Sequence, residues 1–134
     1  MALANDEDRL ETVLRKTVER LARKTGVSAK VVVRARGGDT AGMTRGHTIK
    51  FSLERLKEDI SSEGKRRKQN PYTIARELAA HEYAHVLGNR IDERDAKRHG
   101  PTFRQLEILT NPRGKMKWSD SANGAITQRQ RRKK

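Results

Sequence analysis

The sequence predicts a small α+β domain, and three observations support this fold class. Residues 5–27 carry apolar side chains at steps of three and four, which is the period of an amphipathic helix. Residues 30–36 (KVVVRAR) and 46–52 (GHTIKFS) have the β-branched or alternating character of strands. Residues 70–88 form a second helical pattern with clear start and end signals. A chain of 134 residues is long enough for one domain with a modest core.

The first helix is expected to pack against the core and to carry no chemistry. Acidic residues open it and basic residues close it before Gly26, as the helix dipole favours. Its buried stripe is predicted to consist of Leu10, Val13, Leu14, Val18 and Leu21.

The segment between the two predicted strands, residues 37–46, contains four glycines and several turn formers. We therefore expect a hairpin or meander, and with it a short antiparallel sheet. The stretch IKFS within residues 48–52 is the expected edge strand, where a peptide would pair as an added strand. A short helix over residues 51–60 and a polar surface loop over 61–70 follow.

The helix predicted at residues 70–88 is bounded at both ends. Asn70 is a good N-cap, Pro71 suits the first helical position, and Gly88 suits the position just past the end. This helix is the best defined element in the sequence, so residues on it can be assigned to faces.

The chain beyond residue 88 is predicted to contain a charged connection, a short helix and a basic tail. Asp92, Glu93 and Asp95 are expected to form a solvated acidic cluster. From Arg113 onward the periodicity is lost, so we predict a domain over residues 1–112 and a flexible tail over 113–134. The short helix begins near Pro101 and is expected to bury Phe103, Leu106 and Leu109.

Charge and composition restrict the classes of function. The 31 Lys and Arg against 17 Asp and Glu give a formal charge of +14, which favours a polyanion such as DNA, bound electrostatically and without sequence readout. The absence of cysteine excludes disulfides, thiolate metal sites and cysteine nucleophiles. With no secretion signal and no apolar span, we expect a cytoplasmic protein without membrane contact, nucleoid-associated or nuclear according to its host, and a monomer. The expected DNA contacts are Lys65, Arg66, Arg67, Lys68, Arg131, Arg132, Lys133 and Lys134.

Histidines gather in residues 81–103 (HEYAHVLGNRIDERDAKRHGPTF). His81 and His85 are four residues apart, so on a helix they lie on one face and reach the same ion. Glu82 lies about 100° around the helix, where a carboxylate acts as general base beside a Zn²⁺ ion without ligating it. Such a zinc centre activates water for hydrolysis of a protein or peptide substrate.

The third ligand of such a zinc ion is open to two assignments. Ile91 occupies the position where metzincins place their third histidine, which excludes that class. His99 precedes a glycine that leaves the backbone free to aim it, and is the preferred ligand. Glu107, on the following helix, is the alternative. His47 opens the second strand and is interpreted as an ordinary strand-end residue.

The spaced motif HEYAH followed by HGPTF resembles the SprT-like zinc metalloproteases, a family that includes the Spartan-type proteases of DNA–protein crosslink repair. The order of helix, strand, glycine-containing turn, strand and metal helix is also similar to theirs. The resemblance implies a small zincin-like metalloprotease core, with His81, His85 and His99 as zinc ligands and Glu82 as general base. The cysteine-based module that many relatives carry after the core is missing.

Two other functions fit the same residues. One is a small metallopeptidase with no role at DNA, whose positive charge serves stability or acidic substrates. The other is a non-enzymatic DNA-binding protein in which the zinc is structural, although such a site has no need for Glu82.

Overall fold

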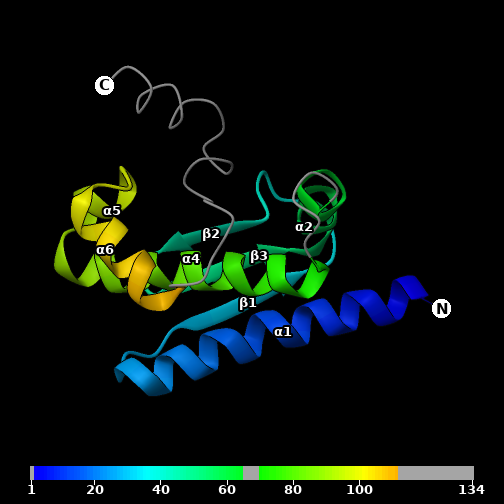
Figure 1. Cartoon of the computed structure of the whole chain (residues 1–134), viewed down its shortest axis with the longest axis horizontal. Coiled ribbons are helices and arrows are strands. Elements are labelled where there is room, and N and C mark those ends of the chain that lie inside the picture. Colours follow the sequence, from blue (N-terminus) through cyan, green and yellow to red (C-terminus); the bar gives the residue numbers. More distant parts are fainter. Residues whose placement is uncertain (1, 65–69, 112–134) are drawn as a thin grey trace.

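A computed structural model describes residues 2–64 and 70–111, and within them an α+β fold with a three-stranded mixed sheet (Figure 1). The predicted α+β class is thereby confirmed, and the first helix and the second strand lie close to their expected positions. The elements are α1 (Ala2–Thr25), β1 (Lys30–Arg34), β2 (Gly42–Arg45), β3 (Thr48–Ser52), α2 (Leu53–Asp59), the π-helical turn η1 (Ile60–Gly64), α4 (Pro71–Ile91), α5 (Glu93–Lys97) and α6 (Pro101–Thr110).

The sheet has the order β1-β3-β2, so the expected antiparallel sheet is only partly right. β3 runs antiparallel to β2 but parallel to β1, with Val31 opposite Ile49 and Thr44 opposite Ile49 from the other side. The reason is that the glycine-rich segment contains a strand of its own, β2, which takes the chain past the position of β3. A tight turn at Gly46, whose φ is 62°, then returns the chain as the central strand.

The position of β3 also corrects the expected edge strand. Residues 48–52 pair on both sides, so their backbone groups are already used within the sheet. Within the described residues the edge strand on the side of α4 is β2, which packs against that helix. Any peptide that adds to the sheet beside α4 would therefore pair with residues 42–45.

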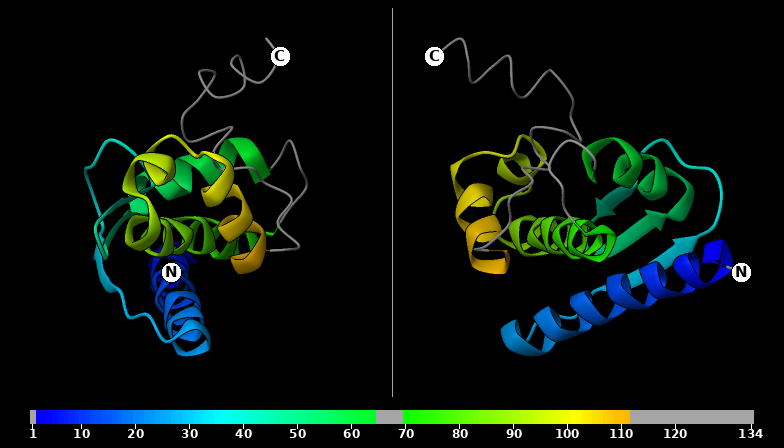
Figure 2. Two further views of the ribbon diagram at one scale, coloured as in Figure 1. Left: turned by 90° about the vertical axis from the view of Figure 1, so that its left-hand side faces the viewer. Right: turned by 45° about the vertical axis from the view of Figure 1, so that its right-hand side comes forward.

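The core lies between the sheet, α1 and α4. The stripe of α1 is buried as predicted at Leu10, Leu14, Val18 and Leu21, with Val13 partly buried. β3 contributes Ile49 and Phe51 from one face of the sheet. α4 packs on α1, on β2 and β3, and on α5 and α6, so it is the central helix of the molecule (Figures 1 and 2).

Helix α4 continues to Ile91, past the end predicted at Gly88. Gly88 lies inside the helix, and its lack of a side chain serves packing: a Cβ there would lie 2.9 Å from the Cβ of Ala96 on α5. The glycine therefore allows close approach of two helices instead of ending one. Beyond it, α6 buries Phe103, but Leu109 is 66% exposed, contrary to the prediction, because it lies on the side of α6 away from α4.

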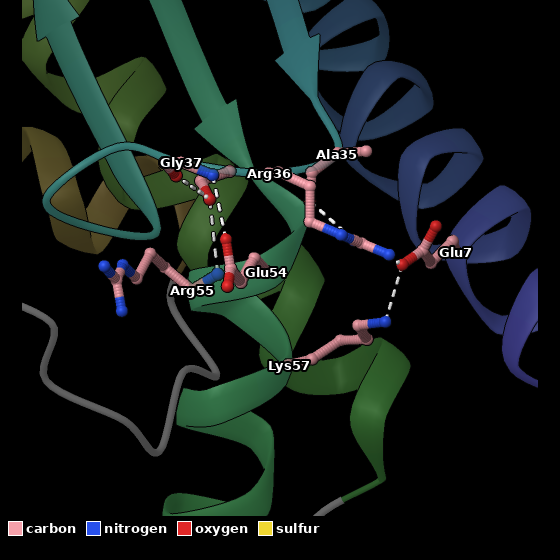
Figure 3. A network of polar contacts seen from close by, with 8 residues as sticks. Glu7, Ala35, Arg36, Gly37, Glu54, Arg55 and Lys57 are labelled. Atoms are coloured by element: carbon pink, nitrogen blue, oxygen red, sulfur yellow. Dashed lines mark hydrogen bonds and ion pairs between the residues drawn. The ribbon is translucent and has the colours of Figure 1, made fainter.

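A polar network holds the connection from β1 to β2 against the two helices at that end (Figure 3). Glu7 of α1 accepts from Lys57 Nζ at 2.6 Å and from Arg36 at 3.1 Å. Glu54 accepts the backbone N–H of Gly37 at 2.8 Å. This network fixes the segment that leads into β2, the strand beside α4.

No helix in the described part of the chain is both long and apolar enough to cross a lipid bilayer.

Candidate metal centre

Helix α4 brings His81 and His85 to the same place. Its start is fixed by Asn70, whose side chain accepts the N–H of Tyr72 at 2.8 Å, and by Pro71 in the first turn. The ring centroids of His81 and His85 are 4.9 Å apart, and His81 is only 2% exposed. The two imidazoles lie along α4 in line with Ile74 and Leu78, which are buried in the core.

The third predicted histidine joins them. His99 Nε2 lies 3.0 Å from His85 Nε2, and one ring nitrogen from each of the three histidines lies within 4.8 Å of the others. His99 follows α5, a five-residue helix that turns the chain back from the end of α4. The spacing of the motif therefore predicted correctly which histidines meet.

The turn that carries His99 depends on Asp95, which is buried and not part of a solvated cluster as expected. Its carboxylate accepts the N–H of Phe103 at 2.7 Å and of Thr102 at 3.3 Å, which caps the start of α6. A Cβ at Gly100 would lie 2.2 Å from Asp95 Oδ1, so only glycine fits between them. His99 itself adopts a left-handed conformation, with φ of 54°. The buried carboxylate thus fixes a strained turn.

Glu107 contacts His81 instead of standing among the ligands. Its Oε2 lies 2.7 Å from His81 Nδ1. An ionised carboxylate only accepts, so Nδ1 carries the proton and Nε2 keeps its lone pair for a cation. Among the described residues, the group that can hold a metal consists of the three histidines and does not include Glu107. The two sequence candidates therefore have separate positions, His99 in the group and Glu107 behind His81.

Phe103 forms the apolar wall of the centre. Its ring centroid lies 4.4 Å from that of His85, 4.8 Å from His99 and 5.2 Å from His81. The ring is completely buried, so it keeps water away from one side of the imidazoles and limits their rotation.

Glu82 lies beside the histidines and is held by β2. Thr44 donates its hydroxyl to Glu82 Oε1 at 2.6 Å and also to the backbone oxygen of Glu82 at 3.1 Å. A Cβ at Gly42 would lie 2.9 Å from Glu82 Cγ and 3.1 Å from its Oε2, so glycine makes room for the carboxylate. Within the described residues no hydrogen bond reaches Oε2. Neither contact can be predicted from local sequence patterns, because both join segments that are distant along the chain.

The three histidines and Glu82 line one cavity of about 570 Å³, which is walled on the other side by β2 and closed at its end by α5. Residues 42–46, Asn89, Glu93 and Lys97 contribute to its lining. The candidate metal centre therefore borders a cavity, whereas structural zinc sites are closed by four protein ligands.

Burial sets the protonation of the centre. Burial raises the pKa of Glu82, while the hydrogen bond from the Thr44 hydroxyl opposes the rise. Burial, with a smaller contribution from the imidazoles of His81 and His99, lowers the pKa of His85 to about 2. Burial, assisted by His81 and opposed by Glu107, lowers the pKa of His99 to about 4. Both histidines are thus neutral near pH 7, which is the form that binds a cation.

The residues fit a zinc ion. Zn–N bonds of about 2.0–2.1 Å place the nitrogens of a tetrahedral site roughly 3.3 Å apart. The 3.0 Å between His85 and His99 is close to this value, and one nitrogen from each of the three rings lies within 4.8 Å of the others. Three neutral imidazoles with one oriented by a carboxylate are typical zinc ligands.

His47, interpreted from the sequence as an ordinary strand-end residue, lies outside the histidine group. His47 is exposed, belongs to the turn before β3 and accepts the N–H of Lys30 through its backbone oxygen. The expected DNA contacts at 65–68 and 131–134, and the tail as a whole, lie outside the described residues.

Comparisons of the chain with protein-family models, with curated proteins and with solved structures found no match.

Proposed function

We propose that the chain is a zinc-dependent endopeptidase of the SprT-like type. The observation that carries the proposal is a single cavity lined by three convergent imidazoles and by the buried carboxylate of Glu82, which lies on the same helix as two of them. His81, His85 and His99 would hold the ion. When bound, zinc supplies a Lewis acid that polarises the scissile carbonyl and lowers the pKa of a water molecule.

Glu82 would serve as the general base and acid. The Thr44 hydroxyl holds Oε1, which leaves Oε2 to take a proton from the attacking water as its oxygen bonds to the carbonyl carbon. The same oxygen then gives the proton to the amide nitrogen as the C–N bond breaks. A raised pKa supports this role, because the carboxylate must hold the proton between the two steps.

The substrate would lie along β2. This strand is at the edge of the sheet in the described part of the chain and lines the cavity with residues 42–45, so an extended peptide that pairs with it would pass the histidines. The formal charge of +14 further suggests substrates that are themselves held on DNA, as the resemblance implies.

The test combines metal analysis with cleavage of an unfolded protein such as casein. The wild-type chain should contain one zinc per molecule, cleave casein, lose activity to a chelator and regain it with zinc. Glu82→Gln should keep its zinc and lose cleavage by about 10²–10⁴-fold, which is the usual contribution of a general base. His47→Gln, a change at an exposed histidine outside the centre, is the matched control and should leave both unchanged.

Two outcomes would reject the proposal. Cleavage that survives in Glu82→Gln at the wild-type rate excludes the mechanism. A wild-type protein that holds zinc tightly, cleaves nothing and unfolds when the zinc is removed indicates a structural metal instead.

A further inference from the structure

One face of the sheet is turned away from α4 and carries basic residues. In the sheet register Lys30 lies opposite Thr48, and Lys50 lies opposite Met43, while Ile49 between them is buried on the other face. Because side chains alternate along a strand, the outward face follows directly from this register. We name as the basic sheet face the exposed cations Lys30, Arg34, Arg45 and Lys50, with Met43 and Thr48 between them.

The charges of the basic sheet face are not neutralised. The three strands contain no acidic residue, and none of the four cations forms an ion pair within the described part of the chain. Cations at the neighbouring end of the molecule differ in this respect. Arg36 and Lys57 share Glu7 (Figure 3), and Arg55 pairs with Glu58. The potential over the sheet is therefore positive and open to a partner.

The layout suits an extended polyanion. Adjacent strands are about 4.8 Å apart and alternate residues about 6.6 Å apart, so the four Cα atoms lie within roughly 10 Å by 13 Å. A shallow hollow of about 200 Å³, lined by Met43, Arg45, Thr48 and Lys50, runs over the two strands nearest the candidate metal centre. Separate exposed cations do not converge on one small anion, but they match a chain with regularly repeated charges.

The basic sheet face is continuous with the candidate metal centre. Met43 and Arg45 line both the hollow on the sheet and the cavity that holds the histidines, because β2 separates the two. A partner bound on the sheet would therefore lie next to the cavity.

We propose that the basic sheet face binds the phosphate backbone of a nucleic acid. A nucleic acid strand carries a charge about every 3.4 Å, denser than an acidic protein surface offers. The face has no aromatic side chain, which argues against base stacking and against the anchored contacts of a protein interface. Binding would thus be independent of base sequence. The consequence rests on the proposed function: a protein held on the nucleic acid is presented to the cavity.

The experiment measures binding of the full chain to a labelled DNA oligonucleotide over a series of salt concentrations. Lys30→Glu combined with Lys50→Glu should remove two phosphate contacts and lower the slope of log K against log salt by about 1.8 on duplex DNA. Lys16→Glu combined with Arg20→Glu changes the net charge equally on the exposed side of α1, and should lower the slope far less. Equal losses in both pairs would mean that binding follows net charge alone, which overturns the proposal.

A second arm identifies the class of partner. Poly-glutamate of matched length should compete poorly for the labelled DNA, whereas competition as strong as that of unlabelled DNA would assign the face to acidic proteins. Zinc content, melting temperature and casein cleavage should be unchanged in the Lys30/Lys50 variant, which excludes a folding defect. If the wild type cleaves nothing while this variant still loses DNA binding, the proposed function fails and the binding face stands.

Discussion

Replacing Asp95 with alanine removes the acceptor that caps α6 and holds the turn of His99. The N–H of Phe103, in a fully buried residue, loses its 2.7 Å partner, which costs about 1–3 kcal/mol of stability. The left-handed backbone of His99 costs a further 1–2 kcal/mol or so, and this conformation is no longer held in place once the Asp95 carboxylate is removed. If about 2 kcal/mol is then needed to return His99 to the centre, zinc affinity falls about 30-fold.

The assay is competition for zinc against a chromophoric chelator, together with urea unfolding of the metal-free protein. Ser52→Ala is the matched control, because it removes another buried cap: Ser52 Oγ accepts the N–H of Arg55 at the start of α2. It should lower stability by a similar 1–2 kcal/mol or so and leave zinc affinity within about twofold. Asp95→Asn keeps one oxygen for Phe103 and should recover most of the affinity. Asp95→Ala with wild-type zinc affinity and a stability loss like that of Ser52→Ala would refute the reasoning.

Two other predictions concern the same centre. Glu107→Gln weakens the acceptor on His81 Nδ1 and should lower zinc affinity by about 10–100-fold in the same competition; unchanged affinity would mean that packing alone orients the ring. In the metal-free protein, the pKa of His99 is about 4 and that of His85 about 2, against roughly 6.5 in the unfolded chain. Below pH 6.5 the two histidines bind protons in the unfolded chain but not in the folded chain. The free energy of unfolding should therefore be highest at neutral pH and fall toward pH 4, by about 1–3 kcal/mol per pH unit. Urea midpoints at pH 7, 6 and 5 measure this, and a flat profile would contradict it.

The parts of the centre that the sequence predicts are those fixed by local geometry. His81, Glu82 and His85 follow from helical spacing on a segment with its own start signals at Asn70 and Pro71. His99 could be found because a charged connection of limited length returns the chain to the helix it has just left.

The supporting contacts could not be predicted, because each depends on tertiary packing. Thr44 reaches Glu82 only because β2 forms inside a glycine-rich segment and pairs with β3, which a reading of turn residues does not reveal. Asp95 looks like a surface acid in a charged run, and acts as a cap seven residues before the N–H of Thr102. Glycine is typical of helix ends, so Gly88 indicates one in the sequence. Its role in close helix packing becomes visible only in the structure, where Ala96 packs against it.

Tyr83 fixes the rotation of α4 about its own axis. It lies on α4 nearly opposite His81, and its hydroxyl donates to the backbone oxygen of Val27 and is also hydrogen-bonded to the Thr25 hydroxyl. Side chains extend about 5–6 Å from a helix axis, so a rotation of α4 by 10° would move the imidazoles by about 1 Å. A displacement of that size is enough to cost roughly 100-fold in rate. For the proposed hydrolysis, the phenol on the far side of the helix would therefore limit how far the imidazoles can turn from the cavity, although it touches none of them.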